Sequence, residues 1–155
     1  MNLGSKKLIR VYADMVADLF HHGHLEFLKN ASAMGDYLIV GIMGDYYAAN
    51  EKRQPILTVE ERVAVIVGCR YVDEVIPNAP WSVNADWIAQ HYIDFIVHGD
   101  DFFEEELVHY YSVPIVMGIF RTIPYTPGIS TTEIITRCKD SDLGSKKTSS
   151  FIFVP

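Results

Sequence analysis

Three histidines gather at the start of one segment with helical spacing: His21, His22 and His24. A helix N-terminus presents unpaired amides and a partial positive charge, both of which attract phosphate. His21 and His24 would lie on one side of the first turn, and Gly23 between them leaves room for a bulky anion. The pattern indicates polyphosphate binding or, more simply, an incidental polar cap. Zinc binding is a further alternative, although no Cys or carboxylate stands at a typical companion spacing. His22 is interpreted as a surface residue.

A second candidate phosphate site is the run Gly128, Ile129, Ser130 and Thr131. Glycine permits a tight backbone turn, and Ser130 can cap the helix that follows. Ser130 or Thr131 could also offer hydroxyl and amide donors to a phosphate. On these residues alone, capping and phosphate binding both explain Ser130.

Charged residues follow other expected strands. Lys52 lies in a polar loop, where it is either a solvated cation or a mobile group that folds over an anionic substrate, with Arg53 as its substitute. Asp100 and Asp101 close the fourth expected strand. A carboxylate there could accept from a base or an acceptor amine, or hold magnesium, whereas capping the next helix is the simpler role for Asp101.

The elements that would position these groups alternate along the chain. Apolar runs rich in Val, Ile and Tyr predict strands at residues 8–13, 37–43, 73–77, 93–98 and 114–120. Between them, residues 27–34 and 63–67 carry apolar stripes at helical spacing. We therefore predict an α/β fold: one doubly wound, Rossmann-like domain with a five-stranded parallel sheet. Ligands of such folds bind where the carboxyl ends of strands meet helix N-termini.

Two capping boxes sharpen the expected helix boundaries, because a hydroxyl and a carboxylate three residues apart can satisfy the free amides of a first turn. One pairs Thr58 with Glu61, and the other pairs Ser130 with Glu133.

Composition excludes several classes of function. The chain has 155 residues and a net charge of −7, so it lacks the basic excess that nucleic acid binding needs. No apolar run approaches the roughly 18 to 20 residues of a membrane span, and the first residues lack the apolar core of a secretion signal. We expect a cytoplasmic protein whose two cysteines, Cys69 and Cys138, are reduced. Residues 1–138 are expected to form the domain and the polar stretch 139–155 a mobile tail.

Several motifs together resemble one family. His21-x-Gly23-His24 after a strand is similar to the HxGH signature of nucleotidyltransferases, which adenylyl and cytidylyl enzymes share. The wider context is similar to choline-phosphate and ethanolamine-phosphate cytidylyltransferases, and the resemblance covers about residues 10–137. The segments that carry it are RVYAD (10–14), DLFH (18–21), CRYVDEV (69–75), NAPW (78–81), IDF (93–95) and GISTTEIITR (128–137).

The resemblance implies roles for individual residues. His21, His24 and Lys52 would be catalytic, and Lys52 would contact phosphates of both donor and acceptor. The nucleotide would be bound by Val16, Ala17, His21, Gly23, His24, Asp100, Thr126, Gly128, Ile129, Ser130 and Thr131. The acceptor would be bound by Asp14, Lys52, Trp81, Arg62 and Arg121. The resemblance also implies a homodimer joined through residues 69–75, and Mg²⁺ that accompanies CTP rather than a resident metal.

The chain departs from the family's pattern at three places. Met15 stands where the family has glycine, and Ala17 replaces an aromatic residue, so the first loop should follow a different path. Tyr125 and Thr126 stand where the family has Arg-Thr before the glycine, and Arg121 is the arginine that could reach back. Tyrosine cannot replace the bidentate phosphate contact of a guanidinium.

These observations predict a cytidylyltransferase that moves CMP from CTP to a small phosphorylated or phosphonylated alcohol or amino alcohol and releases pyrophosphate. The acceptor candidates are ethanolamine phosphate, choline phosphate, glycerol phosphate and a phosphonate such as aminoethyl- or hydroxyethylphosphonate. Two alternatives stay open. One is an adenylyltransferase that uses ATP, because base choice rests on contacts that motifs do not reveal. The other is a nucleotide-binding regulator that has lost catalysis.

Overall fold

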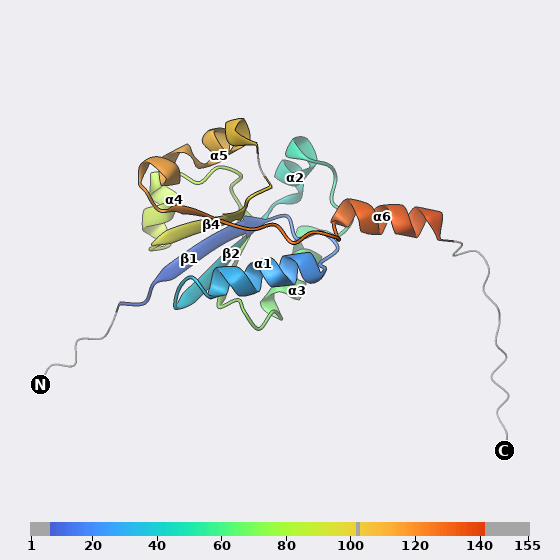
Figure 1. Cartoon of the computed structure of the whole chain (residues 1–155), viewed down its shortest axis with the longest axis horizontal. Helices are drawn as coiled ribbons and strands as arrows, with labels where there is room; N and C mark the ends of the chain where they lie inside the picture. Colours follow the sequence, from blue (N-terminus) through green and yellow to red (C-terminus); the bar gives the residue numbers. More distant parts are fainter. Residues whose placement is uncertain (1–6, 102, 142–155) are drawn as a thin grey trace, which may run out of the picture.

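The computed structural model describes residues 7–101 and 103–141, and it shows one parallel sheet covered by helices on both faces (Figure 1). The strand order is β3-β2-β1-β4-β5, and every neighbouring pair is parallel. The α/β class, the doubly wound arrangement and the five parallel strands are therefore confirmed. The strands are β1 (Arg10–Met15), β2 (Tyr37–Met43), β3 (Glu74–Ala79), β4 (Phe95–Gly99) and β5 (Phe120–Ile123). The helices are α1 (His22–Ser32), α2 (Asp45–Glu51), α3 (Val59–Val67), α4 (Ala85–Gln90), α5 (Glu104–Val116) and α6 (Thr131–Asp140).

Alternation along the central strand β1 divides the core into two layers. Val11 and Ala13 face a cluster that α1 and α3 complete, whereas Tyr12 faces a cluster that α4 and α5 complete. Successive side chains of a strand point to opposite faces, so a sheet that is apolar on both faces needs helices on both. Because β1 lies in the middle of the parallel sheet, the loop that follows it lies at the edge where the neighbouring strands also end.

The sequence places four strands nearly correctly and the fifth wrongly. The run 114–120 was expected to be a strand, but Pro114 lies inside α5 and β5 begins only at Phe120. An apolar run of this length fits the end of a helix as well as a strand. Pro114 lacks an amide and crowds the carbonyl of Tyr110, so α5 is kinked, with non-helical angles at Tyr111. The freed Tyr110 carbonyl accepts a hydrogen bond of 3.2 Å from the Ser82 hydroxyl.

The expected helix starts are largely confirmed. The Thr58 side chain accepts from the Glu61 amide, and the Glu61 carboxylate accepts from the Thr58 amide, which completes the first capping box. Ser130 caps α6 by accepting from the Glu133 amide at 3.1 Å. Helix α6 runs to Asp140, so the domain boundary expected at residue 139 falls inside it; residues 142–155 lie outside the described part of the chain. No helix in the described ranges is long and apolar enough to cross a membrane.

Candidate functional site

The loop between β1 and α1 is tightly folded around Asp18. Ala17 and Leu19 both have positive φ, at 58° and 49°, a conformation that non-glycine residues seldom adopt. The buried Asp18 carboxylate accepts from the amides of Ile56 and Leu57 and forms a 2.9 Å ion pair with Arg53. Burial alone would raise the pKa of Asp18, but these hydrogen bonds and the Arg53 charge hold it below its usual value. Asp18 therefore fixes the first loop to the segment between α2 and α3.

His21 and His24 together cap the first turn of α1. The Gly23 amide donates to Nδ1 of His21 at 3.1 Å, and the His21 amide donates to Nδ1 of His24 at 3.3 Å. Since each Nδ1 is an acceptor, each neutral ring carries its proton on Nε2. Burial, assisted by the neighbouring His21, lowers the pKa of His24 to about 4, and burial also lowers the pKa of His21. At neutral pH the pair offers two uncharged N–H donors.

The start of α6 meets the start of α1. The Thr131 hydroxyl donates to the Asp18 backbone carbonyl at 2.9 Å. A Cβ placed on Gly23 would lie 3.3 Å from the Ile129 side chain, so the two glycine-containing turns touch. Gly128 has a φ of +87°, which favours glycine, and it lets the chain enter α6 at this angle. The N-termini of α1 and α6 therefore lie side by side, as the sequence predicts.

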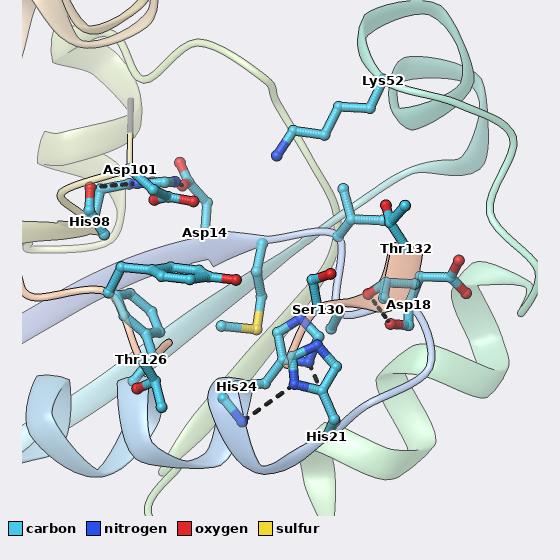
Figure 2. A pocket seen from close by; sticks show the side chains of 18 of the residues that line it. Asp14, Asp18, His21, His24, Lys52, His98, Asp101, Thr126, Ser130 and Thr132 are labelled. Atoms are coloured by element: carbon cyan, nitrogen blue, oxygen red, sulfur yellow. Dashed lines mark hydrogen bonds and ion pairs between the residues drawn. The ribbon is translucent and has the colours of Figure 1, made fainter. Parts of the chain in front are cut away.

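Between these two turns lies a cavity of about 300 Å³, the size of a small ligand site. Figure 2 shows the imidazoles of His21 and His24 beneath Ser130 on one side and Lys52 reaching over from another. Of the residues expected to bind the nucleotide or the acceptor, those in the wall of this cavity are Asp14, Val16, Ala17, His21, Gly23, His24, Lys52, Thr126, Ser130 and Thr131.

A much smaller pocket of about 30 Å³ adjoins the first, and the two share Asp14, Met15, Val16, Lys52 and His98 in their walls. Trp81, expected to contact the acceptor, lines this second pocket. Asp14 is 2% exposed; its Oδ1 accepts from the Tyr111 hydroxyl at 2.6 Å, and its Oδ2 has no hydrogen-bond partner among the described residues. Burial raises the pKa of Asp14, and the nearby His98 and the Tyr111 hydroxyl only partly offset that rise. A buried carboxyl group with one unsatisfied oxygen can accept a hydrogen bond from a further donor.

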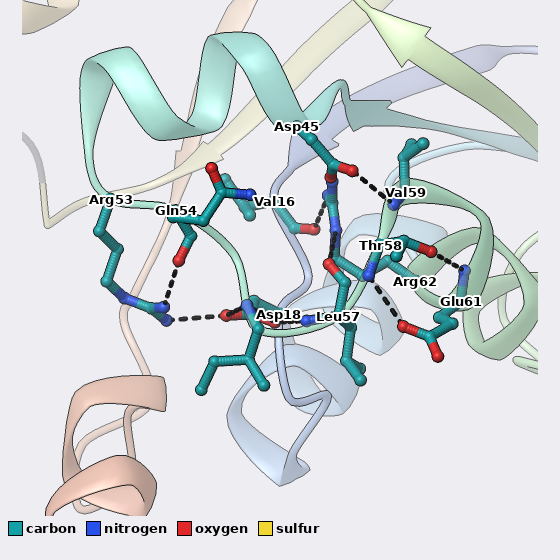
Figure 3. Close-up of polar contacts among 11 residues, drawn as sticks. Val16, Asp18, Asp45, Arg53, Gln54, Leu57, Thr58, Val59, Glu61 and Arg62 are labelled. Carbon is teal, nitrogen blue, oxygen red and sulfur yellow. Dashed lines mark hydrogen bonds and ion pairs between the residues drawn. The ribbon is translucent and has the colours of Figure 1, made fainter.

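Arg62 is a correction to the predicted acceptor site. Its side chain is fully buried and lines neither pocket, and its polar contacts are drawn in Figure 3. The guanidinium donates to the carbonyls of Leu57 and Val16 and forms an ion pair with Asp45. Because Arg62 is buried and lines neither pocket, these contacts give it the structural role of holding the β1 loop in place.

Arg121 is a second correction. It does not line either pocket, and its guanidinium donates to the carbonyls of Gly118 and Phe120 and stacks 5.0 Å from the Phe95 ring centre. β5 is an edge strand, and Arg121 lies on its surface. It therefore does not reach back to the position before Gly128.

Asp100, Gly128 and Ile129 surround the cavity without lining it. Asp100 accepts from the Tyr125 amide at 2.7 Å and so fixes the approach to α6, while its neighbour Asp101 lines the wall. These three residues shape the site rather than face into it.

The sequence reasoning did not identify Tyr111 as a site residue. It is 97 positions from Asp14 and lies on a helix whose apolar run was interpreted partly as strand, so no local signal marks it. Arg53, named only as a substitute for Lys52, lines the cavity through its ion pair with Asp18.

Comparison with known proteins identifies the family. The model of the cytidylyltransferase-like family matches residues 13–137. The chain belongs to the cytidylyltransferase-like family. It is 44% identical over 138 residues to an ethanolamine-phosphate cytidylyltransferase of Dictyostelium discoideum, covering 86% of this chain and 38% of that protein. It is 38% identical over 143 residues to choline-phosphate cytidylyltransferase A of Homo sapiens, covering 90% and 39% respectively. This cytidylyltransferase-like chain thus spans well under half the length of either relative.

Solved structures agree with the fold of this cytidylyltransferase-like chain. A lipopolysaccharide core biosynthesis protein from Thermoplasma volcanium superimposes with a TM-score of 0.63 at 28% identity, covering 79% of this chain and 100% of that one. A nicotinate-nucleotide adenylyltransferase, described as putative, from Vibrio parahaemolyticus gives a TM-score of 0.55 at 12% identity, covering 89% and 92%, and shares the fold alone.

Proposed function

We propose that this chain transfers a cytidylyl group from CTP to a small phosphorylated or phosphonylated amino alcohol and releases pyrophosphate. The observation that carries the proposal is the continuity of the two pockets. A cavity lined by two helix N-termini opens, at Asp14 and Lys52, into a small pocket with an unsatisfied buried carboxylate oxygen. This arrangement suits an acceptor with a phosphate at one end and an ammonium group at the other.

In the proposed reaction an oxygen of the acceptor attacks the α-phosphorus of CTP in line. The bond from that phosphorus to the β-phosphate oxygen breaks, and pyrophosphate leaves, so no covalent enzyme intermediate is needed. The protein positions the two substrates and stabilises the charge that builds on the phosphate oxygens. The Nε2–H groups of His21 and His24 and the amides that open α1 and α6 supply donors on the triphosphate side. Lys52, which lines both pockets, would contact phosphates of both substrates.

The acceptor's ammonium group would donate a hydrogen bond to the unsatisfied Oδ2 of Asp14. The carboxylate already accepts from Tyr111, and a primary ammonium would bind its second oxygen and restore its ionised form. This favours ethanolamine phosphate or 2-aminoethylphosphonate over glycerol phosphate and hydroxyethylphosphonate, which carry no cation. 2-Aminoethylphosphonate lacks the ester oxygen that joins carbon to phosphorus in ethanolamine phosphate, but both acceptors carry a primary ammonium group, so they form one chemical class.

Magnesium belongs in this proposal with the nucleotide. Among residues 7–101 and 103–141, no group of three or more His, Cys, Asp or Glu side chains could hold a metal ion. Two cavity carboxylates, Asp14 and Asp18, already contact Tyr111 and Arg53. Mg²⁺ is commonly bound by substrate phosphates and water with few protein ligands. We therefore treat it as part of the Mg²⁺–CTP substrate, with Asp101 as the nearest carboxylate left at the wall.

The test is a pyrophosphate-release assay with CTP or ATP over a panel of ethanolamine phosphate, choline phosphate, glycerol phosphate and 2-aminoethylphosphonate. Release with CTP and the amino acceptors supports the proposal. Release with ATP instead of CTP would assign an adenylyltransferase. Calorimetric binding of CTP without release for any acceptor would assign a regulator. The homodimer stays a prediction that analytical ultracentrifugation can check.

A further inference from the structure

Beside the small pocket, α2 and α5 are joined by a hydrogen bond. The Tyr110 hydroxyl, on α5, donates to Oε2 of Glu51, the last residue of α2, at 2.8 Å. The Tyr110 ring lines the pocket and packs edge-on against Trp81, with ring centres 5.6 Å apart and planes at 77°. We call the Glu51–Tyr110 hydrogen bond the clasp.

The clasp is part of a segment held from both sides. Glu51 is bound to α5 through the clasp, whereas Arg53, two residues later, forms the 2.9 Å ion pair with Asp18 in the first loop. Lys52 lies between these two attachments and lines both pockets. Outward movement of either end of the segment 51–53 would break one of these two attachments, so both favour the present position of the pocket wall.

The volume of the small pocket beside that wall is small. About 30 Å³ accommodates a group of roughly one or two water molecules, which is close to the size of an ammonium group. A trimethylammonium group carries three additional methyl groups and would need the wall to move. Asp14 would also serve it less well, because a quaternary nitrogen has no N–H to donate to the unsatisfied Oδ2.

We infer that the Glu51–Tyr110 clasp determines acceptor specificity, by keeping the head-group pocket too small for a quaternary ammonium while it admits a primary one. The inference rests on the proposed function, since it concerns the head group of the same acceptor. Tyr110 and Glu51 act through the width of the pocket. Their effect is therefore on the ratio of two acceptors rather than on reactivity with CTP.

The experiment compares the wild type with Tyr110→Phe, Glu51→Ala, Glu51→Gln and Tyr46→Phe. Tyr110→Phe and Glu51→Ala remove the clasp, whereas the amide oxygen of Glu51→Gln can still accept from Tyr110. Tyr46→Phe removes a phenol hydroxyl from an exposed position on α2 and serves as the matched control. The readout is the ratio of kcat/KM for ethanolamine phosphate to that for choline phosphate with CTP. Calorimetric affinity for each acceptor, with an inert CTP analogue bound, is measured in parallel.

We expect the wild type to favour ethanolamine phosphate by at least about 100-fold. Tyr110→Phe and Glu51→Ala should lower this ratio about tenfold by improving use of choline phosphate, while Glu51→Gln and Tyr46→Phe keep it. An unchanged ratio in both clasp variants, or equal affinity of the wild type for the two acceptors, overturns the inference. Selective binding without pyrophosphate release would contradict the proposed function and leave the clasp supported by the affinities. Absence of binding by either acceptor in every variant overturns both.

Discussion

The amide of His21 donates to the ring of His24, and the ring of His21 accepts from the amide two residues along, so each imidazole is oriented by the backbone of the same turn. The ring centres lie 3.9 Å apart. The proton on each ring is thereby placed on Nε2, away from the helix. A capping arrangement that stabilises α1 also sets which nitrogen can donate to a phosphate.

Replacing either imidazole should remove a donor to the triphosphate. We expect His24→Ala and His21→Ala to lower kcat by two to three orders of magnitude, because loss of one such donor typically costs about 3 to 4 kcal/mol of transition-state stabilisation. Pyrophosphate release measures the effect, and circular dichroism checks that the fold is intact. The exposed neighbour His22, as His22→Ala, is the control and should retain activity. Near-normal turnover of either main variant would refute the assignment.

The low pKa of His24 predicts how stability depends on pH. In the unfolded chain His24 is protonated below its ordinary pKa of 6.5. In the folded protein the same ring stays neutral until about pH 4. The free energy of unfolding should therefore fall as the pH drops from 6.5 to 4, with a contribution from His24 of up to about 3 kcal/mol. Urea unfolding of wild type and His24→Gln across this window isolates that contribution.

The comparison with His24→Gln is needed because Asp14 changes the free energy of unfolding in the opposite direction as the pH falls. Its pKa is raised by burial, so its contribution is present below pH 3.8 and is lost as the pH rises through the higher folded value. Equal pH slopes for wild type and His24→Gln would show that His24 is not the group responsible.

Asp14→Asn should separate acceptor binding from nucleotide binding. The amide oxygen can still accept from Tyr111, but it carries no charge for an ammonium group. We expect KM for ethanolamine phosphate to rise at least about 30-fold, equivalent to about 2 kcal/mol, with KM for CTP unchanged. Relief of the buried charge should leave the unfolding midpoint at pH 7 equal or higher. An unchanged acceptor KM would place the head group elsewhere.

Arg62 and Arg121 form a matched pair for testing a structural role. Arg62→Met leaves the Asp45 carboxylate and two carbonyls without their donor, so we expect a loss of about 3 kcal/mol in the free energy of unfolding. Arg121→Met, at an exposed position, should change it by about 0.5 kcal/mol or less and leave acceptor KM unaltered. Chemical denaturation measures both. A rise in acceptor KM for Arg121→Met would restore its predicted role in the site.

Gly128 and Gly118 both have positive φ, at 87° and 71°, and a Cβ at either would meet nothing within 4 Å. Gly128→Ala and Gly118→Ala should each cost about 1 kcal/mol through backbone strain alone. Only Gly128 turns the chain into α6, so only Gly128→Ala should raise KM for CTP. Thermal unfolding measures the loss of stability, and steady-state kinetics measure KM for CTP. Equal KM values for CTP in both variants would show that Gly128 has no role in the nucleotide site.

Much of this site was predictable because its signals are local. His21, Gly23 and His24 share one helical turn, and Ser130 lies at the start of another, so their spacing in the sequence already fixes their geometry. Alternation of strands and helices then brings the loops after the strands to one edge of the sheet.

The parts that sequence reasoning missed depend on contacts between distant segments. Tyr111 lies at the kink of α5 and donates to Asp14, 97 positions away, and neither residue marks the other in the sequence. Arg62 resembles a surface helix residue until tertiary packing buries it under the first loop. The apolar run at residues 114–120 was misassigned because a short apolar run does not by itself distinguish the end of a helix from a strand, and here Ile115, Val116 and Met117 are exposed.

Helix α6 provides one of the two helix N-termini that face the cavity. It has no buried residue, and its far end points away from the sheet (Figure 1). Its first turn is attached to the β1 loop by the hydrogen bond from the Thr131 hydroxyl to the Asp18 carbonyl. Such a helix can detach locally at much lower free energy than the sheet can unfold. If α6 detaches in this way, the free energy of CTP binding includes the free energy needed to hold α6 in place. The backbone amides of α6 should then exchange with solvent far faster in the apo protein than in the complex with CTP.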